Sequence, residues 1–173
     1  MWRYESQEKG VILLTEAALS LGSNMGDRCQ NIKNAIKAID NLPETKVVKI
    51  SNYYETEPFG VPDKQERYIN CCLKISTNLE PLVLLESCLE IEKKLGRTRQ
   101  YRFCPRTIDI DLLIYGHELR NEKNLTLPHP RLKERAFVLA PLNDISQNMV
   151  FGNINFKQNY KSCDLSTVRP IDC

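Results

Sequence analysis

Two stretches of the sequence alternate between apolar and polar residues, and this period of two constrains the fold more than any other feature. In residues 68–76 the alternating apolar residues are Ile69, Cys71, Leu73 and Ile75. In residues 107–115 they are Ile108, Ile110, Leu112 and Ile114. Successive side chains of a strand point to opposite faces, so each stretch is predicted as a strand with one buried face. The sequence therefore predicts a sheet that contains both strands.

Two segments with a helical period lie between the predicted strands. From residue 27 onward, apolar residues recur at the i, i+3, i+4 and i+7 positions, namely Ile32, Ala35, Ile36 and Ile39. The second helix is predicted to begin after Asn78 as its N-cap, with Pro81 in its first turn, and to end at Gly96. Both segments are predicted to pack an apolar stripe against the sheet.

The order of the predicted elements is β-α-β-β-α-β. The four strands cover residues 11–21, 46–54, 68–76 and 107–115. This order is the ferredoxin-like pattern of the α+β class, a mainly antiparallel sheet with helices packed on one face. Residues 132–142 are predicted as a further helix. The segments 1–10 and 153–173 are weakly patterned.

Composition and charge exclude several classes of protein. A chain of 173 residues suits one domain. Its apolar runs, such as residues 11–14 and 112–115, are far shorter than the ~20 residues that cross a bilayer. A net charge of +2 is too small to favour general nucleic-acid binding. We therefore expect neither a membrane nor a nucleic acid as a partner.

The cysteines indicate a reducing environment. There are 7 cysteines, an odd number, and no C-x-x-C spacing occurs. Only His117 and His129 are available to complete a zinc site. Cys71 and Cys88 lie in apolar periodic segments, where a free cysteine behaves as a small hydrophobic residue. We expect reduced thiols and a cytoplasmic location.

Asp109 and Asp111 give the strongest chemical signal. Residues two apart on a strand share a face with their Cα atoms roughly 6.6 Å apart, and carboxylates this close repel unless a cation lies between them. Mg²⁺ fits, because it binds one or two carboxylates and takes waters and phosphate oxygens as its other ligands. Directly upstream lie four arginines, Arg97, Arg99, Arg102 and Arg106. Guanidinium groups bind phosphate bidentately, so the pattern favours a phosphate-rich ligand. Two exposed aspartates beside a basic loop are the alternative.

Three other places carry candidate binding residues. Glu92, on the second predicted helix, is a candidate acceptor for an adenine amino group or a ribose hydroxyl, with an ordinary surface glutamate as the alternative. Tyr68 and Asn70 share the polar face of their strand, which suits a flat, nitrogen-rich heterocycle as well as an ordinary strand surface. Residues 126–131 place a hydroxyl, an imidazole and a guanidinium on one loop. Residues 22–27 lack the Gly-Lys-[Ser/Thr] ending of a P-loop and are predicted as a tight strand-to-helix turn.

Taken together, six ordered motifs resemble the 6-hydroxymethyl-7,8-dihydropterin pyrophosphokinase family. They are residues 21–27, 54–60, 68–70, 96–99, 105–113 and 127–129. The resemblance covers about residues 17–150, and the Pro-Arg-Thr-x-Asp-x-Asp stretch is highly specific. It implies transfer of a diphosphate from ATP to the hydroxymethyl oxygen of the pterin in folate biosynthesis, with release of AMP. It also implies two Mg²⁺ ions on Asp109 and Asp111.

The resemblance implies a role for individual residues as well. The implied catalytic residues are Asp109, Asp111, Arg97 and Arg106. The implied ATP-binding residues are Glu92, Arg97, Arg99, Arg106, Thr126, His129 and Arg135. The implied substrate-binding residues are Thr56, Phe59, Tyr68, Asn70, Phe103 and Phe137. Among these, Tyr68 and Phe137 enclose the pterin ring, and Asn70 binds its edge with the backbone of Thr56 and Phe59.

Parts of the chain lie outside this resemblance or depart from it. Residues 1–16 are interpreted as an N-terminal extension, or as the linker from a fused folate enzyme upstream, and residues 17–173 as the pyrophosphokinase domain. Cys104 stands where a glycine or alanine is usual, and Glu57 and Pro130 are also departures. The rival interpretation is a non-catalytic ferredoxin-like module that binds RNA or a nucleotide. That module would carry paired strand aromatics in an RNP-like signature, which this sequence lacks.

Overall fold

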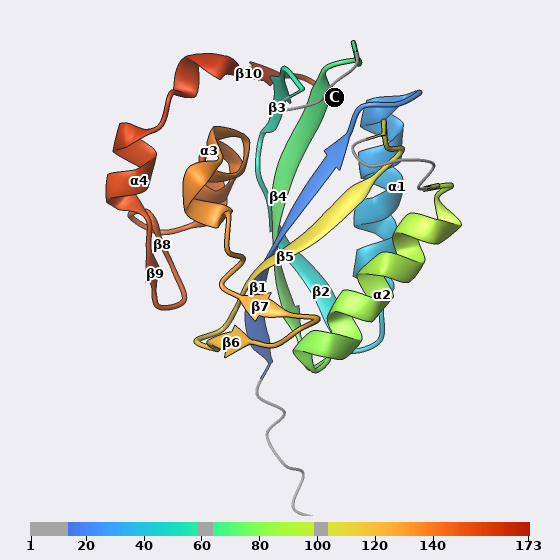
Figure 1. The fold of residues 1–173 in the computed structure, drawn as a ribbon. Coiled ribbons are helices and arrows are strands. Elements are labelled where there is room, and N and C mark those ends of the chain that lie inside the picture. Colours follow the sequence, from blue (N-terminus) through green and yellow to red (C-terminus); the bar gives the residue numbers. More distant parts are fainter. Residues whose placement is uncertain (1–13, 59–63, 99–103) are drawn as a thin grey trace, which may run out of the picture.

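A single antiparallel sheet forms the centre of the computed structural model, which describes residues 14–58, 64–98 and 104–173 (Figure 1). The strand order is β10-β3-β4-β1-β5, and β2 pairs with β4. The strands are β1 (Thr15–Ser23), β2 (Thr45–Ile50), β3 (Tyr53–Thr56), β4 (Tyr68–Thr77), β5 (Asp109–Tyr115) and β10 (Val168–Ile171). Every pairing of these strands is antiparallel. The predicted α+β, ferredoxin-like class is confirmed.

Helices cover both faces of the sheet, whereas the sequence predicted helices on one face only. The helices α1 (Arg28–Asp40) and α2 (Pro81–Lys94) lie on one side, and α3 (Ala136–Ile145) lies on the other (Figure 1). Ala18 and Cys72 belong to the apolar cluster under α3, although Cys72 occupies the polar side of the predicted alternation. A single small apolar side chain, between two polar side chains on the same face of a strand, does not stand out in an alternating pattern. The sequence therefore did not predict the apolar core under α3.

The remaining elements are short. They are the hairpin of β6 (Arg120–Asn121) with β7 (Thr126–Leu127), the hairpin of β8 (Val150–Phe151) with β9 (Ile154–Asn155), the helix α4 (Lys157–Ser162) and the 3-10 turns η1 (Leu132–Glu134) and η2 (Leu165–Thr167). The helix predicted over residues 132–142 is therefore η1 followed by α3. In the part of the chain that the structure describes, no helix combines the length and apolarity that a membrane crossing requires.

The turns at the helix ends partly follow the sequence signals. Asp27 caps α1, because its side chain accepts the backbone N–H of Gln30 at 3.0 Å. The prediction that Asn78 caps α2 is wrong. Glu80 is the capping residue, without a side-chain hydrogen bond, and Asn78 Nδ2 donates instead to Glu44 Oε2 at 2.9 Å. Gly96 follows the helix with a φ of +85°, a conformation that favours glycine.

A bulge in β5 changes the face of one predicted core residue. The register between β1 and β5 shifts between Ala18 and Leu19, so Leu113 has no direct partner. As a result Ile114 packs in the core under α3, and Tyr115 returns to the core under α1 and α2. The prediction that Ile114 shares a face with Ile108 is therefore wrong. Strict alternation along a strand holds only up to the first bulge.

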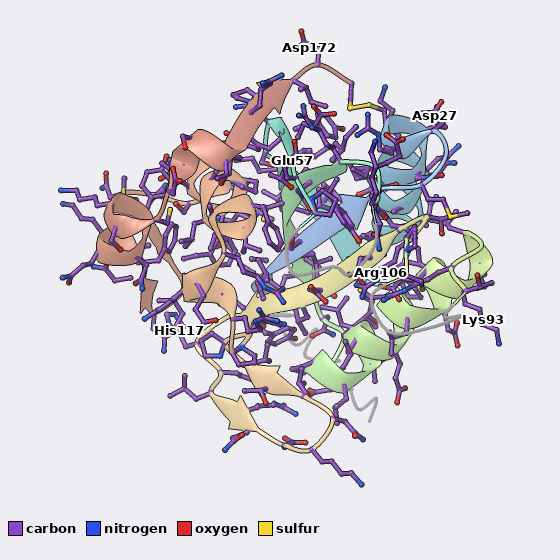
Figure 2. All side chains as sticks on the ribbon, turned by 45° about the horizontal axis from the view of Figure 1, so that its top comes forward. Asp27, Glu57, Lys93, Arg106, His117 and Asp172 are labelled. Atoms are coloured by element: carbon purple, nitrogen blue, oxygen red, sulfur yellow. A yellow bond between two sulfur atoms is a disulfide. The ribbon has the colours of Figure 1, made fainter. Side chains whose placement is uncertain are left out.

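The C-terminal segment is ordered, and its last residue is cross-linked. The strand β10 pairs with β3, and Cys173 forms a disulfide with Cys29 at the start of α1, drawn in yellow beside Asp172 in Figure 2. The prediction that all thiols are reduced is wrong for this pair. The two cysteines are 144 positions apart, and only the pairing of β10 brings them together. Cys71, Cys72 and Cys88 are buried thiols outside this disulfide, and Cys163 is a partly exposed one.

Candidate active site

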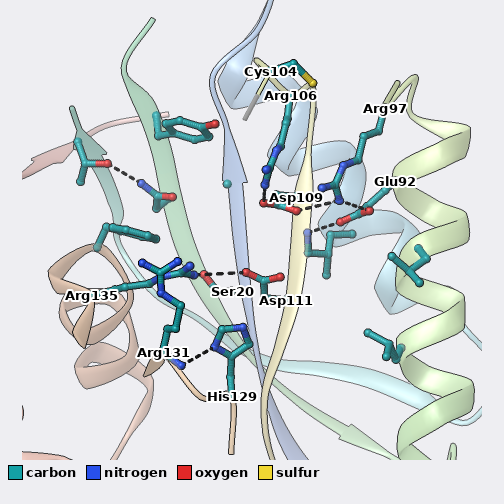
Figure 3. Close-up of a pocket in the computed structure, with 18 of the residues that line it drawn as sticks. Ser20, Glu92, Arg97, Cys104, Arg106, Asp109, Asp111, His129, Arg131 and Arg135 are labelled. Carbon is teal, nitrogen blue, oxygen red and sulfur yellow. Dashed lines mark hydrogen bonds and ion pairs between the residues drawn. The ribbon is translucent and has the colours of Figure 1, made fainter. Parts of the chain in front are cut away.

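A pocket of about 470 Å³ opens over one end of the sheet (Figure 3). Its floor comes from β1, β3, β4 and β5, one wall from α2, and the opposite wall from the segment that leads into α3. Its lining residues are Ser20, Gly22, Thr56, Glu57, Tyr68, Asn70, Leu85, Leu89, Glu92, Arg97, Cys104, Arg106, Asp109, Ile110, Asp111, His129, Arg131, Arg135 and Phe137.

Asp109 is already paired with two arginines on the α2 side of the pocket. Its Oδ1 lies 2.8 Å from Arg97 Nη1, and its Oδ2 forms an ion pair with Arg106 Nη1. Burial alone would lower the pKa of Arg106, but the Asp109 carboxylate outweighs it, so the pKa is raised. The Arg106 guanidinium therefore stays charged, and the two guanidinium groups together fix the orientation of the carboxylate.

Glu92 links α2 to β5 and to Arg97. Only 3% of Glu92 is exposed, so the alternative of a surface glutamate is wrong. Its Oε1 accepts the backbone N–H of Ile110 at 2.7 Å, and its Oε2 forms an ion pair with Arg97. Burial raises the pKa of Glu92, while the Ile110 N–H and the Arg97 charge oppose that rise. A buried carboxylate with these partners positions Arg97 against Asp109.

Asp111 is the less well compensated carboxylate of the pair. Burial, and then the charge of Asp109, raise the pKa of Asp111 to about 6. The cation paired with it is Arg135, whose Nη1 lies 3.9 Å from Asp111 Oδ2, a long and weak contact. Burial is the larger cause of this rise in pKa and the Asp109 charge the second, while the charges of Arg135, Arg106 and Arg97 oppose it only in part.

The opposite wall is basic and consists of His129, Arg131 and Arg135. The backbone N–H of His129 donates to the carbonyl oxygen of Leu113 at 2.8 Å, which fixes the loop to β5. His129 Nδ1 accepts the backbone N–H of Arg131 at 3.2 Å, so in the neutral ring the proton is on Nε2. Burial, and then the charges of Arg135 and Arg131, lower the pKa of His129. At neutral pH this imidazole is an uncharged donor.

An aromatic and amide group forms the remaining part of the pocket. Tyr68 and Phe137 both line it, from β4 and α3 respectively. Asn70 Nδ2 donates to Thr56 Oγ1 at 2.9 Å, and both side chains are buried. A Cβ at Gly22 would lie 2.9 Å from Asn70 Oδ1, so glycine leaves room for this amide. The arrangement suits one face of a flat heterocycle with polar atoms on its edge.

Asn24 connects the turn before α1 to the segment that leads into β5. We call β5 the acidic strand, because it carries Asp109 and Asp111. The backbone N–H of Arg106 donates to Asn24 Oδ1 at 2.8 Å, and the Asn24 N–H donates to the Arg106 carbonyl oxygen at 3.1 Å. The sequence predicted a tight turn at residues 22–27 and gave Asn24 no role. Since the two segments are 82 positions apart, no local pattern reveals this contact.

The structure gathers most of the predicted site residues in this pocket. Those that line it are Thr56, Tyr68, Asn70, Glu92, Arg97, Arg106, Asp109, Asp111, His129, Arg135 and Phe137. Thr126 lies on β7 and is not among the lining residues. Phe59, Arg99 and Phe103 lie outside the described residues.

Sequence reasoning missed several lining residues. They include Ser20, Leu85, Leu89 and Ile110, whereas Arg131 lies in the candidate segment 126–131. Leu85 and Leu89 are seven and three residues before Glu92, which places all three on one face of a helix. Ser20 and Gly22 likewise share one face of β1. These spacings are visible in the sequence. They indicate pocket residues only when it is known that Glu92 faces the pocket.

The donor set of the acidic strand is suited to a hard divalent cation. Asp109 and Asp111 offer carboxylate oxygens and no sulfur or nitrogen. Within the described ranges no group of three or more His, Cys, Asp and Glu residues could hold a metal ion. Two carboxylates with the remaining positions left for water or phosphate oxygens is the usual arrangement for Mg²⁺. The residues present therefore fit Mg²⁺ held jointly by protein and ligand.

Curated relatives resemble this chain over most of its length. A pyrophosphokinase of Bacillus subtilis (strain 168) acting on 2-amino-4-hydroxy-6-hydroxymethyldihydropteridine is 43% identical over 133 residues, which are 77% of this chain and 79% of that protein. A protein of the same name from Methylorubrum extorquens is 39% identical over 159 residues, 92% of this chain and all of the relative.

Two longer proteins also match. The bifunctional protein FolKE of Lactococcus lactis is 42% identical over 130 residues, and this chain spans 37% of that protein. A crystal structure of an HPPK-DHPS in complex with substrates shares the fold with a TM-score of 0.65 and 14% sequence identity. The match covers 86% of this chain, which spans 43% of the crystallised chain.

The assignment of this chain to a protein family rests on its match to a family model. The model described as 7,8-dihydro-6-hydroxymethylpterin-pyrophosphokinase (HPPK) matches residues 18–147. These residues include the acidic strand, α2, the basic wall and the aromatic part of the pocket. The chain therefore belongs to the 7,8-dihydro-6-hydroxymethylpterin-pyrophosphokinase family.

Proposed function

We propose that this chain transfers a diphosphate from ATP to the hydroxymethyl oxygen of 6-hydroxymethyl-7,8-dihydropterin, giving the pterin diphosphate and AMP in folate biosynthesis. One observation supports this most directly. Two carboxylates of β5 face a basic wall across a single pocket, beside an aromatic and amide group suited to a flat heterocycle. A metal-bound polyphosphate and a pterin are the two ligands that such a pocket accommodates.

In this proposal the pterin occupies the aromatic part of the pocket. Tyr68 and Phe137 lie against the two faces of its ring. Asn70 and the Thr56 backbone bind the edge of the pterin ring. The buried Asn70 amide favours such a ligand, because water does not reach it to supply the same hydrogen bonds. Burial raises the pKa of Tyr68, which keeps its phenol neutral against the ring. Phe59 and Phe103, outside the described residues, are proposed as further contacts.

ATP occupies the space between the two walls in this proposal. Glu92 binds the nucleoside side, and the phosphates are bound by Arg97, Arg106, His129 and Arg135. His129, neutral with its proton on Nε2, donates a hydrogen bond without adding charge. Arg99 and Thr126 remain proposed ATP contacts from the family resemblance, although Thr126 does not line the described pocket.

Asp109 and Asp111 are proposed to hold two Mg²⁺ ions together with the phosphates. When bound, the ions would neutralise phosphate charge and make the hydroxymethyl group easier to deprotonate. Asp109 is held in place by Arg97 and Arg106. Asp111 is held less firmly, by the long contact with Arg135.

The chain's own groups contribute positioning and charge neutralisation. The hydroxymethyl oxygen gives up its proton to solvent and bonds to the β-phosphorus, while the bond from that phosphorus to the oxygen of the α-phosphate breaks and AMP leaves with that oxygen. No side chain has to become covalently attached. Arginines of both walls stabilise the charge that develops on the phosphate oxygens, which is how most phosphoryl-transfer sites work.

The location and the wider partners of the enzyme are part of the same proposal. We retain the cytoplasm as the location, because the reaction consumes ATP. The bifunctional relative from Lactococcus lactis supports a fused or neighbouring folate enzyme, for which residues 1–16 would be the extension or linker.

The proposal is tested by mixing the purified chain with ATP, Mg²⁺ and 6-hydroxymethyl-7,8-dihydropterin and measuring AMP. We expect AMP and pterin diphosphate in equal amounts, and neither product when the pterin is omitted or EDTA is added. Formation of ADP would indicate transfer of a single phosphate and contradict the proposal. Binding of nucleotide without any turnover would favour the non-catalytic module instead.

A further inference from the structure

Arg131 lies in the pocket without a role in the reaction proposed above. It lines the pocket on the basic wall, directly before η1. Its side chain and that of Arg135 converge on the space in front of Asp111 (Figure 3). The positive charge of Arg131 adds to burial in lowering the pKa of Arg135 and of His129. Two guanidinium groups therefore act on the same small volume.

This concentration of positive charge is poorly compensated by the described residues. The carboxylate paired with Arg131 is Glu134, whose Oε2 is 3.9 Å from Arg131 Nε. The Glu134 side chain is 69% exposed, so water screens this contact. Arg135 reaches Asp111 only at 3.9 Å. Both residues line the pocket, where an anion would pair with their guanidinium groups.

We propose that Arg131 binds the phosphate chain of ATP together with Arg135, as a phosphate contact of the basic wall. The inference rests on the proposed function and extends it to one further residue. A polyphosphate carries several charges along its length, so adjacent guanidinium groups can each bind different oxygens. The acidic strand, across the pocket, would hold the same phosphates through Mg²⁺.

The geometry allows this role to be tested by side-chain substitution alone. The hydrogen bond to His129 Nδ1 comes from the backbone N–H of Arg131, so replacing the side chain leaves it intact. Arg131→Ala removes the guanidinium group. Arg131→Lys keeps the positive charge but loses the planar set of N–H donors that binds an anion bidentately. Lys133→Ala is the matched control, because Lys133 is an exposed cation two residues further on, within η1, and does not line the pocket.

The experiment measures binding of Mg²⁺ with α,β-methylene-ATP by calorimetry, and steady-state kinetics of AMP formation. We expect Arg131→Ala to weaken analogue binding and to raise the KM for ATP by about tenfold, as loss of a charged hydrogen bond does. Arg131→Lys should fall between it and the wild type. The KM for the pterin and the melting temperature should not change, and Lys133→Ala should resemble the wild type.

The outcomes separate this inference from the function on which it rests. Equal effects of Arg131→Ala and Lys133→Ala would overturn it, since general surface charge would then account for both. A rise in the KM for the pterin alone would also overturn it. If the wild type made no AMP but bound the analogue more tightly than Arg131→Ala does, the reaction would be wrong and the phosphate contact supported.

Discussion

The two walls of the pocket differ in how their charges are paired. On the α2 side, Glu92, Arg97, Asp109 and Arg106 form a continuous set of short contacts. On the opposite wall, the ion pairs of Arg131 and Arg135 are both 3.9 Å long. The first wall is organised before any ligand binds, because each charge already has a partner. The second keeps unbalanced positive charge, and an anionic ligand is what would complete it.

The contrast extends to how the walls are attached to the fold. Glu92 lies on a helix and is hydrogen-bonded to the strand that carries the aspartates. The basic wall lies on a loop and a 3-10 turn, attached to β5 through the backbone of His129. Rigid elements hold the groups that need accurate geometry. The loop can adjust to phosphates of a bound nucleotide.

Neutralising either aspartate of β5 should have the largest effect on turnover. Asp109→Asn and Asp111→Asn each remove an anionic ligand that holds Mg²⁺ against the phosphates. We expect turnover to fall roughly 10²- to 10⁴-fold at saturating Mg²⁺ and substrates. The measurement is the rate of AMP formation alongside a thermal melt of each variant. Near-normal turnover in either variant, or a loss explained by unfolding, would contradict the metal assignment.

Weakening the contact between α2 and β5 at Glu92 should lower turnover by a smaller factor. Glu92→Gln keeps an acceptor for the Ile110 N–H but removes the charge that is paired with Arg97. Arg97 retains Asp109, so we expect turnover to fall about 10- to 100-fold, with a loss of thermal stability. Glu90→Gln is the control, because Glu90 lies on the same helix and is exposed, 3.9 Å from Lys94. If the two variants behave alike, preorganisation of this wall is not needed.

The smallest expected effect is that of Asp111→Asn on the thermal stability of the protein without bound metal or ligand. The pKa of Asp111 rises from 3.8 to about 6, through burial and the charge of Asp109, against the opposing charges of Arg135, Arg106 and Arg97. The protonated form therefore stabilises the fold below pH 3.8, and this contribution is lost as the pH rises through about 6. Asp111→Asn mimics that form at every pH, so it should be more stable than the wild type only at higher pH.

The size of this gain is limited by solvent. The Asp111 side chain is 39% exposed, which screens its interactions. We expect a rise in melting temperature of about 1–3 °C at pH 8 in EDTA, and no difference near pH 4. A variant that is less stable than the wild type at pH 8 would show that the Asp111–Arg135 contact outweighs burial and the repulsion from Asp109.

Local patterns predicted the fold class well, because each predicted strand and helix depends on its own residues. The alternation around Asp109 and Asp111 placed both side chains on one face of β5, where the structure has them. The helical spacing of Ile32 and Ile39 likewise predicted α1. These features follow from periods of two and of 3.6 and need no knowledge of distant residues.

Long-range features could not be predicted in the same way. The strand β10 is short and polar in part, and it is ordered by pairing with β3 far earlier in the chain. The disulfide of Cys29 with Cys173 depends on that pairing. Asn24 and Arg106 meet only because β1 and β5 are neighbours. The convergence of Arg131 with Arg135 depends on how the loop before α3 crosses the sheet.

A crystal structure with α,β-methylene-ATP, Mg²⁺ and 6-hydroxymethyl-7,8-dihydropterin tests the account most directly. We predict metal ions bound to Asp109 and Asp111, phosphate oxygens between them and the guanidinium groups of Arg131 and Arg135, and the pterin between Tyr68 and Phe137. The contacts of Glu92, Arg97 and Asp109 should match those described above, while the basic wall moves toward the phosphates. A nucleotide bound elsewhere, or phosphates that contact neither the aspartates nor the basic wall, would contradict the account.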